Sequence, residues 1–231
     1  MKANQKLKAS DGYEVMLFPL ACLYVTQGEN GSYSHNGILA MDFAGYGSSG
    51  VIEDCPMFAP CSCKCVATID VNNKGRIFES LNKVHTPNGL DYVTFMCFHD
   101  ENPIASVGDT FNQGEIFAHT GTAGNVTGDH THFNTAMGKY QGWENVPPDN
   151  NGQLINSSHI YDTCYVNDTV IVNGFGYTWR IFSSIVKKLS KFPWVLYARK
   201  LRDKFYWQFV FFVLSYNKGG IKNGKIKYWR I

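Results

Sequence analysis

Seven histidines are the residues of this chain best suited to chemistry, and two of them form a His-x-His pair. His130 and His132 are two positions apart. In a β-strand, residues with this spacing point to the same side, so both imidazoles can face one site. Imidazole binds metals and transfers protons near neutral pH. The pair by itself does not distinguish a metal site from an accidental arrangement.

A carboxylate and two further histidines complete a candidate metal-binding set. Asp42 lies inside the otherwise apolar run Ile38–Phe43, where a charge is costly unless it is paired or bound to a metal. His35 precedes this run, and His99 follows the alternating run Tyr92–Phe98. Two histidines and one aspartate would hold zinc and leave one coordination position open for water. The simpler alternative is a turn histidine beside an edge-strand carboxylate.

The segments that carry these residues are short and apolar, and they predict β-strands. Turns rich in Gly and Asn separate them, and residues 13–173 show no helical period over three turns. We therefore expect an antiparallel, mostly β domain, with a first core strand within Val15–Val25 and a closing strand over Val166–Val172. A loop is expected over Pro147–Gly152. The clearest other strands are Ile38–Phe43, Cys63–Val71, Tyr92–Phe98, Gly114–Ala118 and His130–Ala136.

The seven cysteines do not form a fully paired disulfide framework, because their number is odd. Cys61, Cys63 and Cys65 alternate, which places three thiols on one face of a strand. Zinc knuckles usually separate their cysteines by two or more residues. The spacing therefore favours a half-buried strand with cysteine as a small apolar residue over a metal cluster. This cysteine usage fits a chain made in a reducing cytoplasm.

The formal net charge of +2 conceals two oppositely charged regions. Residues 1–173 contain 8 basic and 18 acidic residues, which gives −10, whereas residues 174–231 contain 13 basic residues and one acid, which gives +12. We predict a domain over 1–173 and a basic, aromatic extension over 174–231. Within the extension, the segments Ile181–Leu189 and Val195–Arg202 are typical of short basic helices.

The sequence does not predict an export signal or a membrane span. The apolar run Val15–Val25 is directly preceded by Asp11 and Glu14, and no cleavage site of small residues follows it. The longest nearly apolar run elsewhere, Phe205–Leu214, falls short of the roughly 18 residues needed to span a bilayer.

Three segments around the candidate residues resemble the lysostaphin/LytM-type zinc metallopeptidases, which cleave peptides of bacterial peptidoglycan. They are SHNGILAMDFAG, VTFMCFHDEN and GTAGNVTGDHTHFNTAMG. The runs FPLACLYVTQG and PMFAPCSCKCVATI are also similar to core strands of that family. The resemblance covers about residues 15–172 and implies the family's antiparallel β fold, a duplicated hybrid motif.

The resemblance also implies residue roles and a cofactor. His35, Asp42 and His132 would be the ligands of one Zn²⁺ per chain, and His99 and His130 would be the paired catalytic histidines. Six residues separate His35 from Asp42, whereas the family usually has three, so a longer loop must place His35. The remaining histidines, His85, His119 and His159, are expected outside the site.

The implied function is hydrolysis of peptide bonds in the stem peptide or cross-bridge of peptidoglycan. A chain without an export signal fits a bacteriophage lysin, or a wall hydrolase carried in the virion, present in the phage particle or the host cytoplasm before it reaches the wall. The alternative from another class is a non-catalytic relative that serves as a virion structural protein or activates another hydrolase.

The basic extension over residues 174–231 lies outside the resemblance, and several roles remain open for it. Its charge and aromatic residues would suit anionic wall polymers, a membrane surface or virion proteins. It could equally close over the acidic domain. No recognition motif supports nucleic acid as a partner.

Overall fold

The computed structural model of the protein describes residues 1–70 and 74–183. The chain divides into two units, Met1–Phe182 and Ser183–Ile231, and the first contains nearly all described residues. The predicted helix Val195–Arg202, most of the predicted helix Ile181–Leu189 and most of the basic extension lie outside the described residues.

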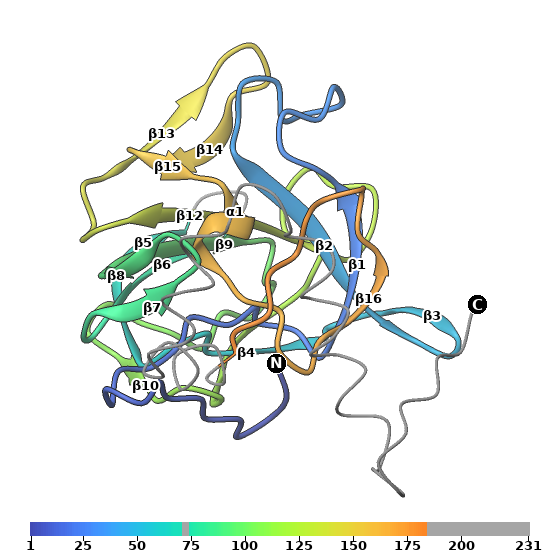
Figure 1. Ribbon diagram of the computed structural model, residues 1–231. Helices are drawn as coiled ribbons and strands as arrows, with labels where there is room; N and C mark the ends of the chain where they lie inside the picture. Colours follow the sequence, from blue (N-terminus) through green and yellow to red (C-terminus); the bar gives the residue numbers. More distant parts are fainter. Residues whose placement is uncertain (71–73, 184–231) are drawn as a thin grey trace, which may run out of the picture. The chain divides into compact units, whose positions relative to one another are not determined.

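A large sheet forms the centre of the first unit (Figure 1). Its strand order is β10-β5-β6-β9-β12-β2-β1-β16, with β15 paired to β12 and β3 paired to β2. Its strands are β1 (Cys22–Gln27), β2 (Ala40–Gly47), β3 (Gly50–Ile52), β5 (Cys63–Ile69), β6 (Gly75–Ser80), β9 (Val93–Phe98), β10 (Thr110–Phe111), β12 (Thr131–Met137), β15 (Ser157–Ser158) and β16 (Val170–Asn173).

Three two-stranded sheets and one short helix surround this sheet. The helix has a single turn. These elements are β4 (Pro56–Phe58) with β11 (Ile116–His119), β7 (Val84–Thr86) with β8 (Gly89–Asp91), β13 (Trp143–Val146) with β14 (Asn151–Leu154), and α1 (Ile160–Thr163).

The predicted mostly β fold is confirmed, and the described part of the central sheet is antiparallel except at one edge, where β16 runs parallel to β1. The strands predicted around the candidate site occur as β2, β9 and β12 with small shifts at their ends. The first core strand begins only at Cys22, because Val15 and Leu17 form isolated bridges instead. The predicted loop Pro147–Gly152 is the turn of the β13–β14 hairpin, whose second strand already begins at Asn151.

Aromatic side chains form a cluster within the core, and all of them but Phe18 lie on strands. Six fully buried phenylalanines contact one another in edge-to-face, tilted or stacked pairs, close to the geometries that aromatic quadrupoles favour. They are Phe18, Phe43, Phe78, Phe95, Phe117 and Phe133. Burial of these rings contributes to holding the strands of the site in register.

The alternating cysteines are buried on one side as the sequence pattern predicts, but only Cys63 and Cys65 lie in β5, and Cys61 precedes it. Cys61, Cys63 and Cys65 are fully buried, whereas the intervening Lys64 is exposed. Burial raises the pKa of all three thiols. All seven cysteines are free thiols, so these three serve as apolar packing residues rather than as reactive groups.

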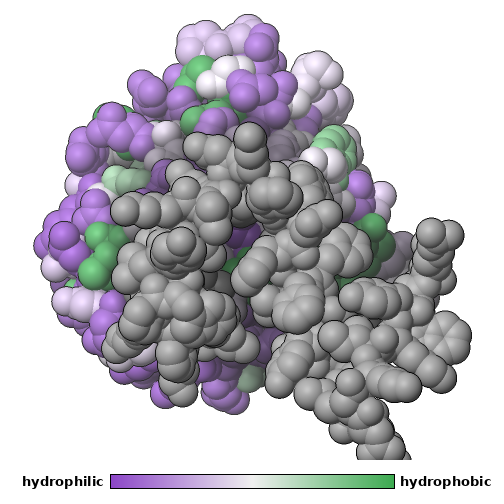
Figure 2. All heavy atoms as spheres, in the orientation of Figure 1, coloured by the Kyte–Doolittle hydropathy of each residue, from purple (hydrophilic) through white to green (hydrophobic). Residues whose placement is uncertain are grey.

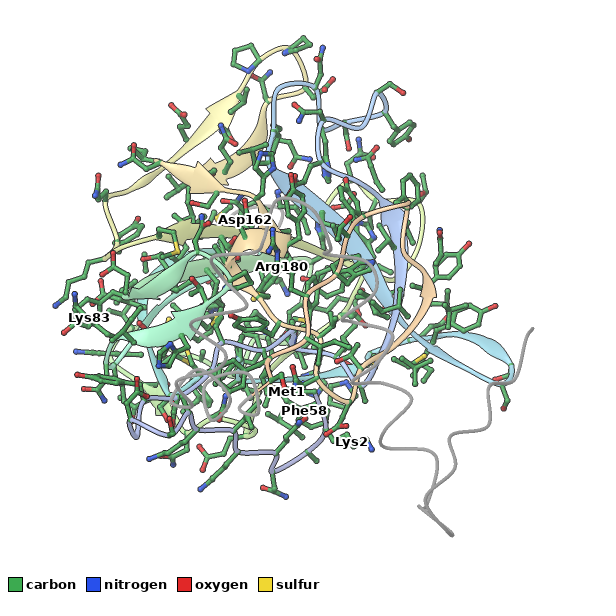
Figure 3. All side chains as sticks on the ribbon, in the orientation of Figure 1. Met1, Lys2, Phe58, Lys83, Asp162 and Arg180 are labelled. Carbon is green, nitrogen blue, oxygen red and sulfur yellow. The ribbon has the colours of Figure 1, made fainter. Side chains whose placement is uncertain are left out.

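Residues just beyond the predicted domain boundary at 173 pack against the β domain. Tyr177 and Trp179 contact the main core, and Trp179 meets Phe18 edge to face with ring centroids 5.2 Å apart. Arg180 lies beside Asp162 of α1 (Figure 3), with Nη2 4.0 Å from Oδ1. The boundary after residue 173 stays a prediction.

Outside the atoms drawn in grey, hydrophilic residues cover most of the visible face, with hydrophobic residues scattered among them (Figure 2). This distribution is usual for a folded domain. No helix within the described ranges has the length and apolar character required to cross a bilayer.

Candidate metal centre

Two of the predicted metal ligands lie opposite each other on adjacent strands. His132 of β12 is the cross-strand partner of Asp42 of β2, and directly opposed side chains in a sheet share a face. On the other side of β12, Phe98 opposes His132, and its ring stacks on the imidazole with centroids 5.3 Å apart. The sheet register therefore brings His132 and Asp42 together.

The third predicted ligand, His35, comes from the long loop between β1 and β2. The amide of His35 donates to Gly31 O at 2.9 Å, and the carbonyl of His35 accepts from the amide of Ile38 at 2.9 Å. These bonds fold the loop back on itself and return His35 to Asp42. The loop thus accommodates the six residues between His35 and Asp42.

The β13–β14 hairpin supports this loop from outside the sheet. In Figure 1 the loop before β2, in blue, rises beside the yellow hairpin. Asn151 Nδ2 donates to Ser34 O at 3.3 Å, and the amide of Leu39 donates to Gln153 Oε1 at 3.3 Å. The hairpin therefore holds the chain on both sides of His35.

One donor atom from each of the three residues converges on a small triangle. His35 Nε2 lies 3.1 Å from Asp42 Oδ1 and 3.1 Å from His132 Nδ1, and His132 Nδ1 lies 3.2 Å from Asp42 Oδ1. All three residues are buried. Among the described residues, this is the group of histidine, cysteine and acidic side chains whose arrangement could hold a metal ion.

Backbone carbonyls decide which ring nitrogens face the triangle. His35 Nδ1 lies 3.0 Å from Gly28 O, and His132 Nε2 lies 2.7 Å from Gly152 O. A carbonyl oxygen only accepts hydrogen bonds, so these two nitrogens carry the hydrogens. In their neutral forms, both histidines then direct a lone pair at the carboxylate oxygen of Asp42.

Three buried acceptor atoms 3.1–3.2 Å apart, from a carboxylate and two neutral imidazoles, repel one another unless a cation lies among them. The donor set fits zinc, whose nitrogen and oxygen ligands lie at ~2.0–2.2 Å in tetrahedral geometry, which places neighbouring ligand atoms ~3.3–3.6 Å apart. Acceptors behind metal-bound histidines are the usual second layer of such sites. The residues present therefore fit a zinc ion.

The triangle favours the charged form of Asp42. Burial alone would raise the pKa of this carboxyl group. Without a metal ion, His132 and His35 in their protonated forms would donate hydrogen bonds to it, and these bonds and the ring charges outweigh burial and lower its pKa well below its ordinary value. Asp42 is thus a carboxylate at neutral pH, the form that binds a metal.

The two predicted catalytic histidines lie together next to the triangle. The rings of His99 and His130 have centroids 4.7 Å apart. His99 Nδ1 donates to Ala123 O at 2.8 Å, and His130 Nδ1 donates to Gly128 O at 2.7 Å. In the neutral form, each ring therefore retains a lone pair on Nε2, and His130 Nε2 lies 3.8 Å from Asp42 Oδ2.

A short loop after β11 connects these two histidines. Gly121 exchanges two backbone hydrogen bonds with His130, at 3.0 and 3.1 Å, and the amide of Ala123 donates to His99 O at 3.0 Å. His99 has a φ of +82°, a left-handed conformation that is uncommon for residues other than glycine and often occurs at functional sites. The hydrogen bond from Ala123 keeps His99 in this left-handed conformation.

The buried position of His99 makes the stability of the protein depend on pH. Burial, followed by the proximity of His130 and His132, lowers the pKa of His99 from 6.5 to about 3. Below pH 6.5 the unfolded chain therefore binds a proton that the folded chain does not. The contribution of His99 to stability is complete above pH 6.5 and is lost as the pH falls toward 3.

We expect the free energy of unfolding of the chelator-treated protein to decrease between pH 6.5 and 4, with His99 contributing up to ~1.4 kcal/mol per pH unit. His99→Asn keeps a donor near Nδ1 and tolerates positive φ, so it should remove this slope while it preserves the fold. Urea unfolding at several pH values measures both. Parallel pH profiles for the two proteins would contradict this account.

The remaining histidines lie outside the triangle, as expected. His85 pairs with Asp11, with Nε2 2.8 Å from Oδ2, and His119 ends β11. His159 pairs with Glu29, with Nδ1 2.6 Å from Oε2. What sequence reasoning missed are the four carbonyl acceptors at positions 28, 123, 128 and 152, because a main-chain group carries no side-chain signature.

Comparison with known proteins connects the chain to phage and peptidase proteins. No protein-family model matches the chain. Morphogenesis protein 1 of Bacillus phage B103 is 41% identical over 175 residues, which are 75% of this chain and 46% of the relative. The chain thus spans about half the length of this curated relative.

Similar solved structures include two peptidases and the catalytic domain of a prophage-encoded M23 protein. A zinc-containing peptidase from Vibrio cholerae is 16% identical, with a TM-score of 0.38 over 57% of this chain and 43% of that chain. The catalytic domain of the prophage-encoded M23 protein EnpA from Enterococcus faecalis, solved as a point mutant, is 16% identical, with a TM-score of 0.38 over 51% and 82%. The catalytic domain of lysostaphin from Staphylococcus simulans is 20% identical, with a TM-score of 0.36 over 50% and 79%.

Proposed function

We propose that this protein is a zinc-dependent endopeptidase that hydrolyses peptide bonds in bacterial peptidoglycan. The observation that carries the proposal is the buried triangle of His35, Asp42 and His132, with two more histidines directing free Nε2 atoms next to it. The motif resemblance to lysostaphin/LytM-type enzymes supports the substrate class.

His35 Nε2, His132 Nδ1 and Asp42 Oδ1 would hold the zinc ion. When bound, zinc polarises a carbonyl group and lowers the pKa of a coordinated water toward ~7. Phe98 stacked on His132 excludes water from one side of the ligands. The carbonyls of Gly28 and Gly152 keep the ligand nitrogens deprotonated and correctly oriented.

His99 and His130 would handle the protons of the reaction, and the structure suggests different tasks for them. The low pKa of His99 suits a neutral ring that accepts a hydrogen bond at Nε2 and orients the attacking water. His130 is less buried than His99, and its Nε2 lies 3.8 Å from Asp42 Oδ2, beside the candidate metal ligands. We therefore assign proton uptake from the water, and delivery to the leaving amine, to His130 Nε2.

The similarity to Morphogenesis protein 1 of phage B103 supports a place in a phage particle for this protein. We propose a virion-associated hydrolase that opens the wall locally, and an endolysin as the variant of the same activity. The same similarity favours the rival function, a non-catalytic virion component. The basic residues of 174–231 would then contact anionic wall polymers, a membrane surface or virion proteins.

Zinc analysis and metal removal distinguish the proposed endopeptidase from a non-catalytic virion component. We expect freshly purified protein to contain one zinc per chain and to release peptides with new amino termini from one or more of several purified peptidoglycans. A strong zinc chelator should abolish this release, and added zinc should restore it. Mass spectrometry of the fragments identifies the scissile bond. Less than one zinc per chain, together with no cleavage of any wall, would support the structural role instead.

A further inference from the structure

A β-bulge near the end of β1 changes which residue faces Asp42. The pairs Leu23–Gly45, Tyr24–Ala44 and Val25–Phe43 keep one register between β1 and β2. That register would place Thr26 opposite Asp42, but the strands shift there and Gln27 becomes the partner of Asp42. Bulges of this kind reorient side chains and are frequent next to active sites.

Because of the bulge, Gln27, Asp42 and His132 lie side by side on the three neighbouring strands β1, β2 and β12. Thr26 is exposed, whereas Gln27 is partly buried and lies across from Asp42, which itself lies across from His132. A threonine side chain is too short to reach the far oxygen of the carboxylate, whereas a glutamine reaches it. The shift therefore replaces a short side chain with a long amide at this position.

The amide of Gln27 contacts two parts of the candidate metal centre. Its Nε2 donates to Asp42 Oδ2 at 3.3 Å and to Ser34 Oγ at 2.9 Å. Its Oε1 accepts from the amide of Ser34 at 3.3 Å. These three bonds use the donors and the acceptor of a primary amide consistently. Gln27 thereby joins the carboxylate ligand to the residue that precedes His35.

Asp42 Oδ2, the oxygen that accepts the hydrogen bond from Gln27, also lies near His130. Asp42 Oδ1 belongs to the triangle, and Asp42 Oδ2 lies 3.8 Å from His130 Nε2. Without the Gln27 donor, Oδ2 would be left to swing toward the metal as a second ligand atom or to bind His130 directly. Either change alters the metal geometry or occupies the nitrogen that moves the proton.

We propose that Gln27 is a positioning residue that keeps Asp42 a one-oxygen ligand, anchors the His35 loop through Ser34 and leaves His130 Nε2 available. This inference rests on the proposed metal site. It accounts for how a loop longer than the family pattern still presents His35 accurately.

The test compares Gln27→Met with Thr26→Ala in the full-length chain. Methionine has nearly the same shape as glutamine but lacks the amide, and Thr26 is the exposed bulge residue. Loss of supporting contacts around metal ligands typically weakens binding by about 10–100-fold. We expect this loss for Gln27→Met in zinc competition with a chromogenic chelator, and an altered visible absorption spectrum of the Co²⁺-substituted protein. Thr26→Ala should match the wild type in both.

Gln27→Leu provides a second variant in case Gln27→Met does not fold. It removes the donor to Asp42 and adds no charge or ligand atom near the metal, so zinc binding should weaken by at least ~10-fold. Wild-type affinity and Co²⁺ spectrum in both folded variants would overturn the role of Gln27 and leave the proposed function intact. A wild-type protein that binds neither Zn²⁺ nor Co²⁺ would instead overturn the metal site itself.

Discussion

His132→Ala is expected to reduce bound zinc from one per chain to a trace, whereas His130→Ala should keep the zinc and lose hydrolysis. His132 contributes one of three buried donor atoms, so its removal leaves a site with two ligands. His130 lies beside the triangle and has the proposed role of proton transfer, which typically accounts for roughly 10²–10⁴-fold in rate. Metal analysis by mass spectrometry and peptidoglycan digestion measure the two effects separately.

His85→Ala is the matched control, because His85 is an ion-paired histidine outside the candidate site. It should retain both zinc and hydrolysis. Full activity of His130→Ala would show that the assignment of proton transfer to this residue is wrong. Retention of one tightly bound zinc by His132→Ala would show that the triangle is not the metal site.

Gly121→Ala is expected to lower hydrolysis by about 100-fold while zinc stays bound. A Cβ added at Gly121 would collide with His99 O and approach the amide nitrogen of Glu101 to 3.2 Å. Both are backbone atoms, so the loop must move, and the paired histidines move with it. Displacement of catalytic groups by about 1 Å can reduce a rate ~10²-fold. The ligands His35 and Asp42 lie on another part of the chain and should be little affected.

Gly128→Ala tests whether this effect is specific. Gly128 lies in the same segment, an added Cβ there meets no atom within 4 Å, and its carbonyl still accepts from His130 Nδ1. This variant should hydrolyse at the wild-type rate. Equal losses in the two variants would point to general loosening of the segment, and a wild-type rate for Gly121→Ala would contradict the proposed role of the loop in placing His99.

The sequence was most informative where strand periodicity and residue chemistry coincide. The His-x-His spacing and an aspartate inside an apolar run predicted that His132 and Asp42 could meet, and the sheet register places them directly opposite each other. His99 follows β9 and lies beside His130, as the family resemblance implied. The mostly β fold followed from the same alternation. The catalytic and ligand roles of these residues remain predictions.

The sequence was less informative where long-range pairing decides the structure. The shift that exchanges Thr26 for Gln27 depends on how β1 pairs with β2, and the residues themselves do not encode it visibly. The parallel pairing of β16 with β1 joins Cys22 to Val170, two residues far apart along the chain. The packing of Trp179 on the β core similarly reflects contacts that the abrupt change of charge after residue 173 obscured.

The four carbonyls that orient the histidines have a consequence for how this site can change over generations. Every residue has a main-chain carbonyl, so replacing the side chain at position 28, 123, 128 or 152 does not remove an anchor, provided that the chain keeps its path. Insertions and deletions displace that path. Lineages carrying this site should therefore tolerate other residues at positions 123 and 128 and conserve the lengths of the segments between the histidines. Gly28 and Gly152 should stay glycine, because an added Cβ there would collide with Tyr177 and Phe98.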